Sequence, residues 1–159
     1  MALTLFSSAF EHNGKIPSKY TCDGDRELSP PLVWSGVPEG TKSLVLIMDD
    51  PDIPEVFKKS RGIDSFDHWT LFNILPETRE IAEGGVVGTA GLNSAGNNKY
   101  TGPCPPPEYE PKEHRYIFVL YALSGILQFN KLPTKQQVLE ALTSHLLAKA
   151  ELVGRYSRK

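Results

Sequence analysis

One stretch of the chain, residues 97–123, most constrains the fold, because it joins a proline-rich loop to a long β-prone segment. Its second half, residues 115–123, is rich in Tyr, Ile, Phe and Val, which favour an extended strand. Side chains two residues apart on a strand share a face, so His114 and Tyr116 are expected to point the same way. A titratable ring and a phenol are therefore predicted at the mouth of an apolar strand face.

The first half of this stretch contains a loop, residues 100–107, with four prolines. The fixed φ angles of proline stiffen the backbone, and a stiff loop loses little conformational entropy when it holds a ligand. Because proline has no N–H, the backbone donors of this loop are chiefly those of Gly102 and Cys104. We expect the loop to form one wall of a pocket.

Composition places the chain among ordinary globular proteins. With 159 residues, of which 40% are hydrophobic, it is long enough for one domain, residues 1–159, with a sizeable core. The net charge of −2 provides no chain-wide basic field for nucleic acid or an anionic membrane. We see no signal peptide, no segment of transmembrane length and no polybasic or amphipathic anchor. These features predict a cytoplasmic protein that binds no nucleic acid and has no stable membrane anchoring.

The remaining pattern is mainly that of β-strands. Residues 43–48 form a nearly continuous apolar run, which predicts a central strand covered on both faces. Residues 68–74 predict a second strong strand, and the glycine-rich residues 82–102 an irregular binding loop. A capping-box pattern, Thr-x-x-Gln, predicts a helix that begins after residue 134 and ends near residue 149. The expected fold is a mainly β sandwich with one clear helix.

Polar side chains lie at the ends of three of these apolar strands. Asp50 and Asp52 follow the first, His68 begins the second, and His114 with Tyr116 begins the third. Each residue alone is explained by an ordinary strand end, where an Asp before a proline or an exposed histidine is common. Their recurrence at three strand ends, beside a rigid loop, favours a binding pocket.

Short segments that carry these residues are specific when taken together. They are DPDIP at 50–54, HW at 68–69, GPCPP at 102–106 and HRY at 114–116, with YTCDG at 20–24 and SPPLVW at 29–34. In the same order, and over nearly the whole chain, they resemble the signature segments of the phosphatidylethanolamine-binding protein family. The last two segments are similar to its prokaryotic branch, the Raf-kinase-inhibitor-like proteins.

The resemblance implies a Greek-key β-sandwich with one helix in the C-terminal region, a short terminal strand and a small surface pocket. Such a pocket binds anionic or phosphorylated groups, such as phosphate, a phosphoethanolamine headgroup or a nucleotide, and uses no catalytic residue, metal or cofactor. The residues that match the family's ligand-binding positions are Asp50, Asp52, His68, Gly102, Cys104, Pro105, His114 and Tyr116.

Acidic residues in an anion pocket need an explanation. Our hypothesis is that Asp50 and Asp52 accept hydrogen bonds from the imidazoles and favour their charged form. A charged histidine and the Tyr116 hydroxyl would then donate to oxygen atoms of the ligand. The shortage of backbone donors in the proline-rich loop favours a single phosphate-sized group over a triphosphate.

Two enzymatic alternatives use the same residues. Asp50, Asp52, His68 and His114 have the residue types of a two-histidine, carboxylate metal site, although no HExxH motif is present. In the other alternative, Cys104 is a nucleophile and His114 is its base. A Cys22–Cys104 disulfide is a further option, but a cytoplasmic protein favours reduced thiols.

The third class of function is a protein-interaction module. Such a module would be a kinase regulator, which the family name suggests, or a protease inhibitor, and the polar segment 54–67, with three basic residues, would be the contact surface. A solvated surface loop explains the same segment more simply. The sequence names no specific partner and leaves a homodimer open.

Overall fold

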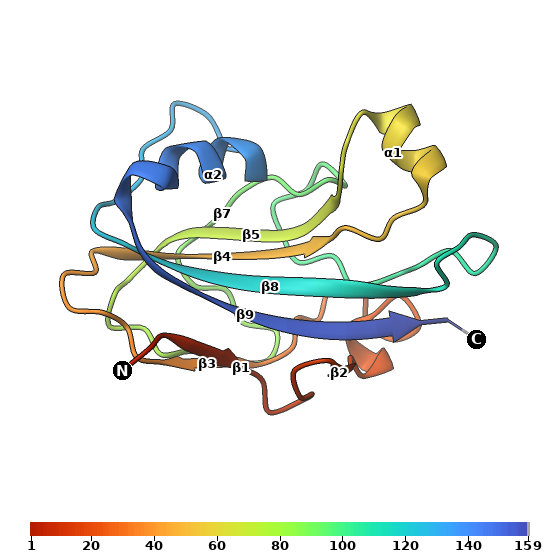
Figure 1. Cartoon of the computed structure of the whole chain (residues 1–159), viewed down its shortest axis with the longest axis horizontal. Coiled ribbons are helices and arrows are strands. Elements are labelled where there is room, and N and C mark those ends of the chain that lie inside the picture. The colour runs from red at the N-terminus through yellow and green to blue at the C-terminus, as the bar shows by residue number, and fades with distance from the viewer. Residues whose placement is uncertain (159) are drawn as a thin grey trace.

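The computed structural model describes residues 1–158, in which two β-sheets pack face to face (Figure 1). Lys159, the last residue of the predicted domain, lies outside the described residues. The smaller sheet has the order β1-β3-β6, and the larger has the order β2-β9-β8-β4-β5-β7. The bounds of the smaller sheet's strands are Thr4–Phe6 (β1), Leu32–Ser35 (β3) and Glu80–Ile81 (β6). The mainly β sandwich predicted from the sequence is therefore confirmed.

The larger sheet contains the long strands. Their bounds are Gly14–Lys15 (β2), Ser43–Asp50 (β4), Phe66–Ile74 (β5), Thr89–Ala90 (β7), Glu113–Leu123 (β8) and Leu146–Ser157 (β9). The helices are α1 (Glu55–Arg61) and α2 (Lys135–Leu142), with single 3-10 turns at Ser18–Tyr20 and Thr143–His145. Figure 1 shows α2 above one face of this sheet and the smaller sheet below the other.

Strand β4 is central in the larger sheet, as its apolar run predicted. It pairs antiparallel with β5 on one side and with β8 on the other. Val45 and Ile47 pack in one cluster with Val138 and Leu142 of α2. The alternate residues, such as Leu44 and Met48, pack between the two sheets. Burial on both faces holds β4 in place, and this fixes the position of the carboxylate at its end.

Two predicted elements are wrong. The polar segment after Pro54, predicted as a loop, contains helix α1, which ends at Arg61 and is capped by Gly62 with a left-handed φ of 66°. The capping box at Thr134 is present, but α2 ends at Leu142 rather than near residue 149. Residues 146–157 instead form β9, a long strand that pairs with β8 along almost its whole length. Pairing with a neighbouring strand satisfies the backbone there, and it overrides the weak helical pattern.

The two cysteines form a disulfide, so the expectation of reduced thiols is wrong in this structure. The Cys22–Cys104 bond links residues 82 positions apart, whose Cα atoms lie 5.4 Å from each other. Beside it, Cys22 N donates to Pro103 O at 3.0 Å. Because disulfides persist mainly in oxidising compartments, the thiol argument for the cytoplasm no longer holds. No helix within residues 1–158 has both the length and the apolar character that a membrane crossing requires.

Opening this disulfide is expected to lower stability without unfolding the protein at room temperature. A crosslink over a loop of this length restricts the unfolded chain, and its loss typically costs about 2–4 kcal/mol. For a domain of this size the melting temperature should fall by about 5–15 °C. Thermal denaturation of the wild type and of the Cys22→Ser/Cys104→Ser variant measures the change, and equal melting temperatures would contradict it.

Candidate functional site

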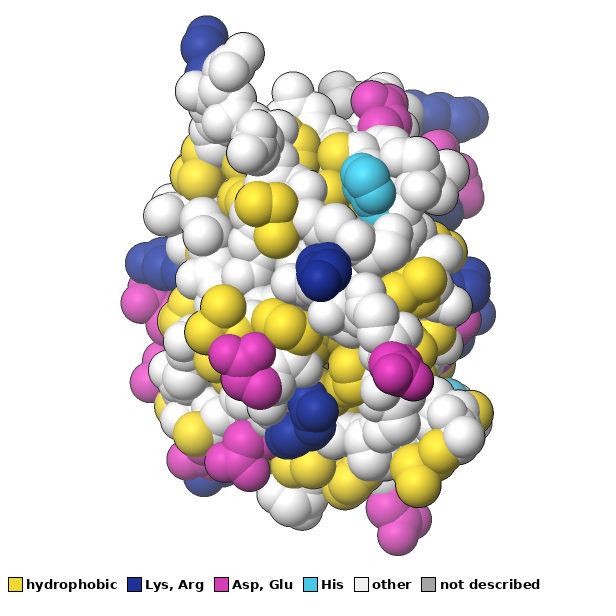
Figure 2. Space-filling view, turned by 90° about the vertical axis from the view of Figure 1, so that its left-hand side faces the viewer, with side chains coloured by type: hydrophobic (Ala, Val, Ile, Leu, Met, Phe, Trp, Pro, Cys, Tyr) yellow, Lys and Arg dark blue, Asp and Glu magenta, His cyan; other side chains and the backbone are white. Residues whose placement is uncertain are grey.

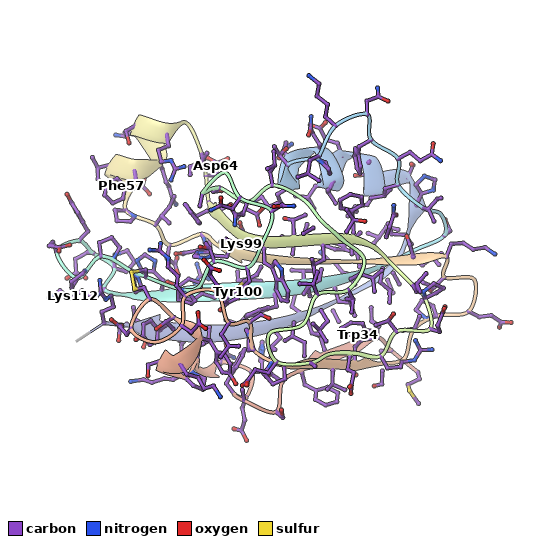
Figure 3. The ribbon with its side chains drawn as sticks, turned by 180° about the vertical axis from the view of Figure 1, so that it is seen from behind. Trp34, Phe57, Asp64, Lys99, Tyr100 and Lys112 are labelled. Carbon is purple, nitrogen blue, oxygen red and sulfur yellow. A yellow bond between two sulfur atoms is a disulfide. The ribbon has the colours of Figure 1, made fainter. Side chains whose placement is uncertain are left out.

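A pocket of about 350 Å³ opens where β4, β5 and β8 meet the loops at one end of the sheet. Asp50, His68, His114 and Tyr116 line it from the three strands. Figure 3 shows this end of the molecule, with Phe57 on α1 above the yellow disulfide bond. At the opposite end, acidic and basic side chains are interspersed with apolar ones (Figure 2). The strands therefore bring together the polar groups that the sequence placed at three separate strand ends.

Asp50 and His114 form a buried hydrogen-bonded pair at the base of the pocket. The distance between His114 Nδ1 and Asp50 Oδ2 is 2.7 Å, and the two residues are only 1% and 2% exposed. A carboxylate only accepts, so Nδ1 carries the hydrogen. The other oxygen of Asp50 accepts the backbone N–H of Asp52 at 2.8 Å. Asp50 is thus fully engaged and fixes the tautomer of the ring.

Two residues of the pocket lining each have a polar atom that is buried without a partner among residues 1–158. These atoms are His114 Nε2 and the hydroxyl oxygen of Tyr116. Burial, followed by the nearby Asp50 carboxylate, raises the pKa of Tyr116, so the phenol keeps its proton and remains a donor. Buried polar groups without a hydrogen bond are rare and costly in native proteins. Because both residues line the pocket, these two atoms are the candidates for a hydrogen bond to a bound molecule.

His68 presents a second imidazole to the pocket. Its Nδ1 lies 2.7 Å from the carbonyl oxygen of Thr101, which can only accept, so Nδ1 again carries the hydrogen. The ring packs against Phe66 and Tyr116. Burial lowers the pKa of His68 below its usual range and outweighs the opposing effect of the Thr101 hydrogen bond. The ring is therefore neutral near pH 7 in the unliganded protein.

Asp52 does not have the predicted contact with an imidazole. Its Oδ2 accepts from Arg115 N and Arg115 Nε, both at 2.9 Å, and its Oδ1 accepts from the same guanidinium at 2.8 Å. These hydrogen bonds hold the pKa of Asp52 below its ordinary value. Asp52 is also not among the lining residues of the pocket. It instead clamps the segment after β4 to the start of β8, which supports the Asp50–His114 pair.

The proline-rich loop forms one wall, as predicted. Gly102, Cys104 and Pro105 all line the pocket. A Cβ atom at Gly102 would lie 2.3 Å from the carbonyl oxygen of Tyr20, so only glycine fits there. Gly102 N donates to Arg26 O at 2.7 Å, and it is therefore not the ligand donor that the sequence suggested.

Sequence reasoning missed the arginines at the pocket. Arg26 and Arg61 both line it, and neither forms a salt bridge with a carboxylate of residues 1–158. The Arg61 guanidinium donates to Ser94 O at 2.7 Å and lies over the Phe66 ring. Phe57 and Ile53 add apolar surface. Arg61 belongs to the basic segment 54–67. Arg26 is flanked by acidic residues, and no sequence pattern marked it as a pocket residue.

The geometry also bears on the enzymatic alternatives. Asp50 and Asp52, the carboxylates of the supposed metal site, are hydrogen-bonded to His114 and Arg115 instead of converging with His68. Within residues 1–158, no three His, Cys, Asp or Glu side chains are grouped as a metal would require. The Cys104 sulfur is bonded to Cys22, and it is no nucleophile while the disulfide holds.

Comparisons with known proteins agree with one another. The family model described as phosphatidylethanolamine-binding protein matches residues 6–157. A protein of Methanothermobacter thermautotrophicus, named UPF0098 protein, is 41% identical, over 98% of this chain and 99% of the relative. The crystal structure of a phosphatidylethanolamine-binding protein homologue from Chlamydia trachomatis has a TM-score of 0.89 and 42% identity, and the match covers 99% of both chains. YbcL of Escherichia coli has a TM-score of 0.85 and 26% identity over 100% of both chains.

A buried carboxyl group lies directly before His68 in β5. Asp67 is 3% exposed, and it accepts hydrogen bonds from Trp69 N at 3.1 Å and from Thr70 Oγ1 at 2.7 Å. Burial raises the pKa of Asp67 to about 6, despite those hydrogen bonds and the nearby positive charge of Lys135. A pKa that is higher in the folded state than in the unfolded state makes ionisation of this group destabilising.

We expect the Asp67→Asn variant to change the pH dependence of stability. The contribution of Asp67 is fully present below its unfolded pKa of roughly 4 and is lost as the pH rises through about 6. Between pH 4 and pH 7.5, the variant should gain about 2–3 kcal/mol relative to the wild type. Urea denaturation across this range measures the gain. The exposed Asp64 provides a control, Asp64→Asn, and a pH-independent difference for Asp67→Asn would contradict the account.

Proposed function

Because the chain belongs to the phosphatidylethanolamine-binding protein family, we propose that its pocket binds one small anionic group without chemical turnover. The phosphoryl group is the best match, either as inorganic phosphate or as part of phosphoethanolamine or a nucleotide. The observation that carries this proposal is the unpartnered, buried Nε2 of His114 in a ring whose Nδ1 is held by Asp50.

Asp50 determines which ring nitrogen of His114 is left to contact a ligand. In the neutral ring, the hydrogen is on Nδ1 and Nε2 has only a lone pair, which repels an anion. When the ring takes up a second proton, Nε2–H becomes a charge-assisted donor, and the Asp50 carboxylate stabilises the positive charge. The Tyr116 hydroxyl supplies another donor on the same wall. Anion binding and proton uptake are therefore linked.

The charges around the pocket also favour an anion. The negative charge of Asp52 is compensated by Arg115, and that of Asp50 is compensated when His114 takes up its second proton. Arg26 and Arg61 line the pocket without a carboxylate partner in residues 1–158. The prolines of the wall offer no N–H groups to wrap a polyphosphate. This combination suits the phosphoryl group itself and provides no free carboxylate for the ammonium of a phosphoethanolamine headgroup.

A kinase or protease partner, a homodimer and a cytoplasmic location are expectations from the sequence and from the family resemblance. We attach none of them to the pocket.

The affinity for sulfate should rise as the pH falls from 8 to 5.5. Sulfate does not titrate in this range, so any pH dependence belongs to the protein. Uptake of one proton with each anion gives up to roughly tenfold tighter binding per pH unit. Isothermal titration calorimetry of the wild type measures this slope. An affinity that does not change with pH would contradict the proposal.

The His114→Gln variant should lose most of the sulfate affinity and most of the pH slope. His145→Gln is the matched control, because His145 lies in the 3-10 turn after α2 and does not line the pocket.

The same titrations after treatment with EDTA should give the same affinities. Binding that disappears with EDTA would favour the metal-site alternative, and unchanged binding by His114→Gln would place the anion elsewhere.

A further inference from the structure

Arg26 lies on the part of the pocket mouth that the disulfide holds in place. It follows Cys22 by four residues, in an exposed loop without regular secondary structure. Three links connect this loop to the proline-rich wall: the Cys22–Cys104 bond, the 3.0 Å hydrogen bond from Cys22 N to Pro103 O, and the 2.7 Å hydrogen bond from Gly102 N to Arg26 O. Of these links, only the disulfide is covalent.

The side chain of Arg26 has no other evident structural role. It is exposed, it lines the pocket, and it forms no ion pair with any carboxylate of residues 1–158. A guanidinium presents a planar fork of donors that matches two oxygens of a phosphoryl group. A loop that is anchored close to the wall keeps this group near the pocket before the ligand arrives, which lowers the entropic cost of binding.

The disulfide is within reach of a chemical reductant. Both cysteines are half-buried rather than fully enclosed, and Cys104 itself lines the pocket. Attack by one thiolate of a dithiol opens the bond through a mixed disulfide. The second thiol of the reagent then releases the protein. The dithiol loses two electrons and becomes a disulfide, and Cys22 and Cys104 each end as a thiol with one proton.

We propose that Arg26 is a specificity-determining contact for the phosphoryl group and that the Cys22–Cys104 disulfide positions it, so that phosphate affinity depends on the redox state. This inference rests on the proposed function of the pocket. In the reduced protein, no covalent bond ties the loop to the wall, and only hydrogen bonds and ion pairs hold it, among them those of Asp23 with Tyr156 and Arg158 and of Glu27 with Lys99. The loop then samples more conformations, and fewer of them place the guanidinium at the ligand. By reciprocity, bound phosphate makes the disulfide harder to reduce by the same factor.

The test is a cycle of four calorimetric titrations with inorganic phosphate at pH 7. The wild type and Arg26→Gln are each titrated with the disulfide intact and with Cys22→Ser/Cys104→Ser, which removes the crosslink without a reductant. Loss of the disulfide should weaken wild-type binding by roughly five- to tenfold, as should Arg26→Gln alone. The two changes together should cost no more than either one. Circular dichroism verifies that each protein is folded at the working temperature.

Arg61→Gln is the matched control, because Arg61 lines the same pocket from α1 and is not attached to the disulfide-linked loop. It should weaken phosphate binding and leave the effect of the disulfide unchanged. Equal affinity with and without the disulfide would overturn the inference, as would a disulfide effect that persists in Arg26→Gln. Absence of phosphate binding in the oxidised wild type would instead refute the proposed function.

A second measurement uses the native cysteines and does not depend on the serine variants. The dithiothreitol concentration that reduces half of the wild-type disulfide should rise roughly five- to tenfold in saturating phosphate. Arg26→Gln should abolish most of this rise. Reduction that is insensitive to phosphate in the wild type would overturn the inference.

Discussion

The hydrogen bond between Asp50 and His114 is the interaction on which the pocket depends. It joins the end of the central strand β4 to the start of β8, and both side chains are buried. Because the carboxylate accepts the Nδ1 hydrogen, Nε2 is the ring nitrogen that we propose as the contact for an anion. The packing of β4 on both faces places Asp50, and the Asp52–Arg115 clamp ties the following segment to β8.

Outside the strands, the pocket is lined by loops and a short helix. The proline-rich wall and the loop that carries Arg26 lie far apart in the sequence, and the Cys22–Cys104 disulfide joins them. Helix α1 contributes Arg61 and Phe57 from the other part of the lining and has no fully buried residue. The sheet thus holds the Asp50–His114 pair, whereas a loop and a short helix hold the positive charges around it.

Local patterns allowed much of this to be predicted from the sequence. The apolar run of β4, the alternation of β8 and the capping box of α2 are local patterns that each predict one element. The positions of His68 and His114 at strand ends predicted that both line one pocket. Pairwise partners were harder to predict. Asp52 binds Arg115 rather than a histidine, and Cys22 binds Cys104 across 82 residues, because such choices depend on tertiary distances. Arg26 was not predicted as a pocket residue, because its loop adjoins the proline-rich wall only in the folded structure.

The central claim is that an anion binds to the protonated Nε2 of His114. Nitrogen-15 NMR of the imidazole rings, recorded at pH 7.5 before and after the addition of phosphate, tests it most directly. Our account predicts that His114 Nε2 changes from an unprotonated to a protonated nitrogen when phosphate binds, while Nδ1 keeps its hydrogen throughout. An Nε2 that stays unprotonated in the phosphate-bound protein, or an Nδ1 that loses its hydrogen, would contradict the account.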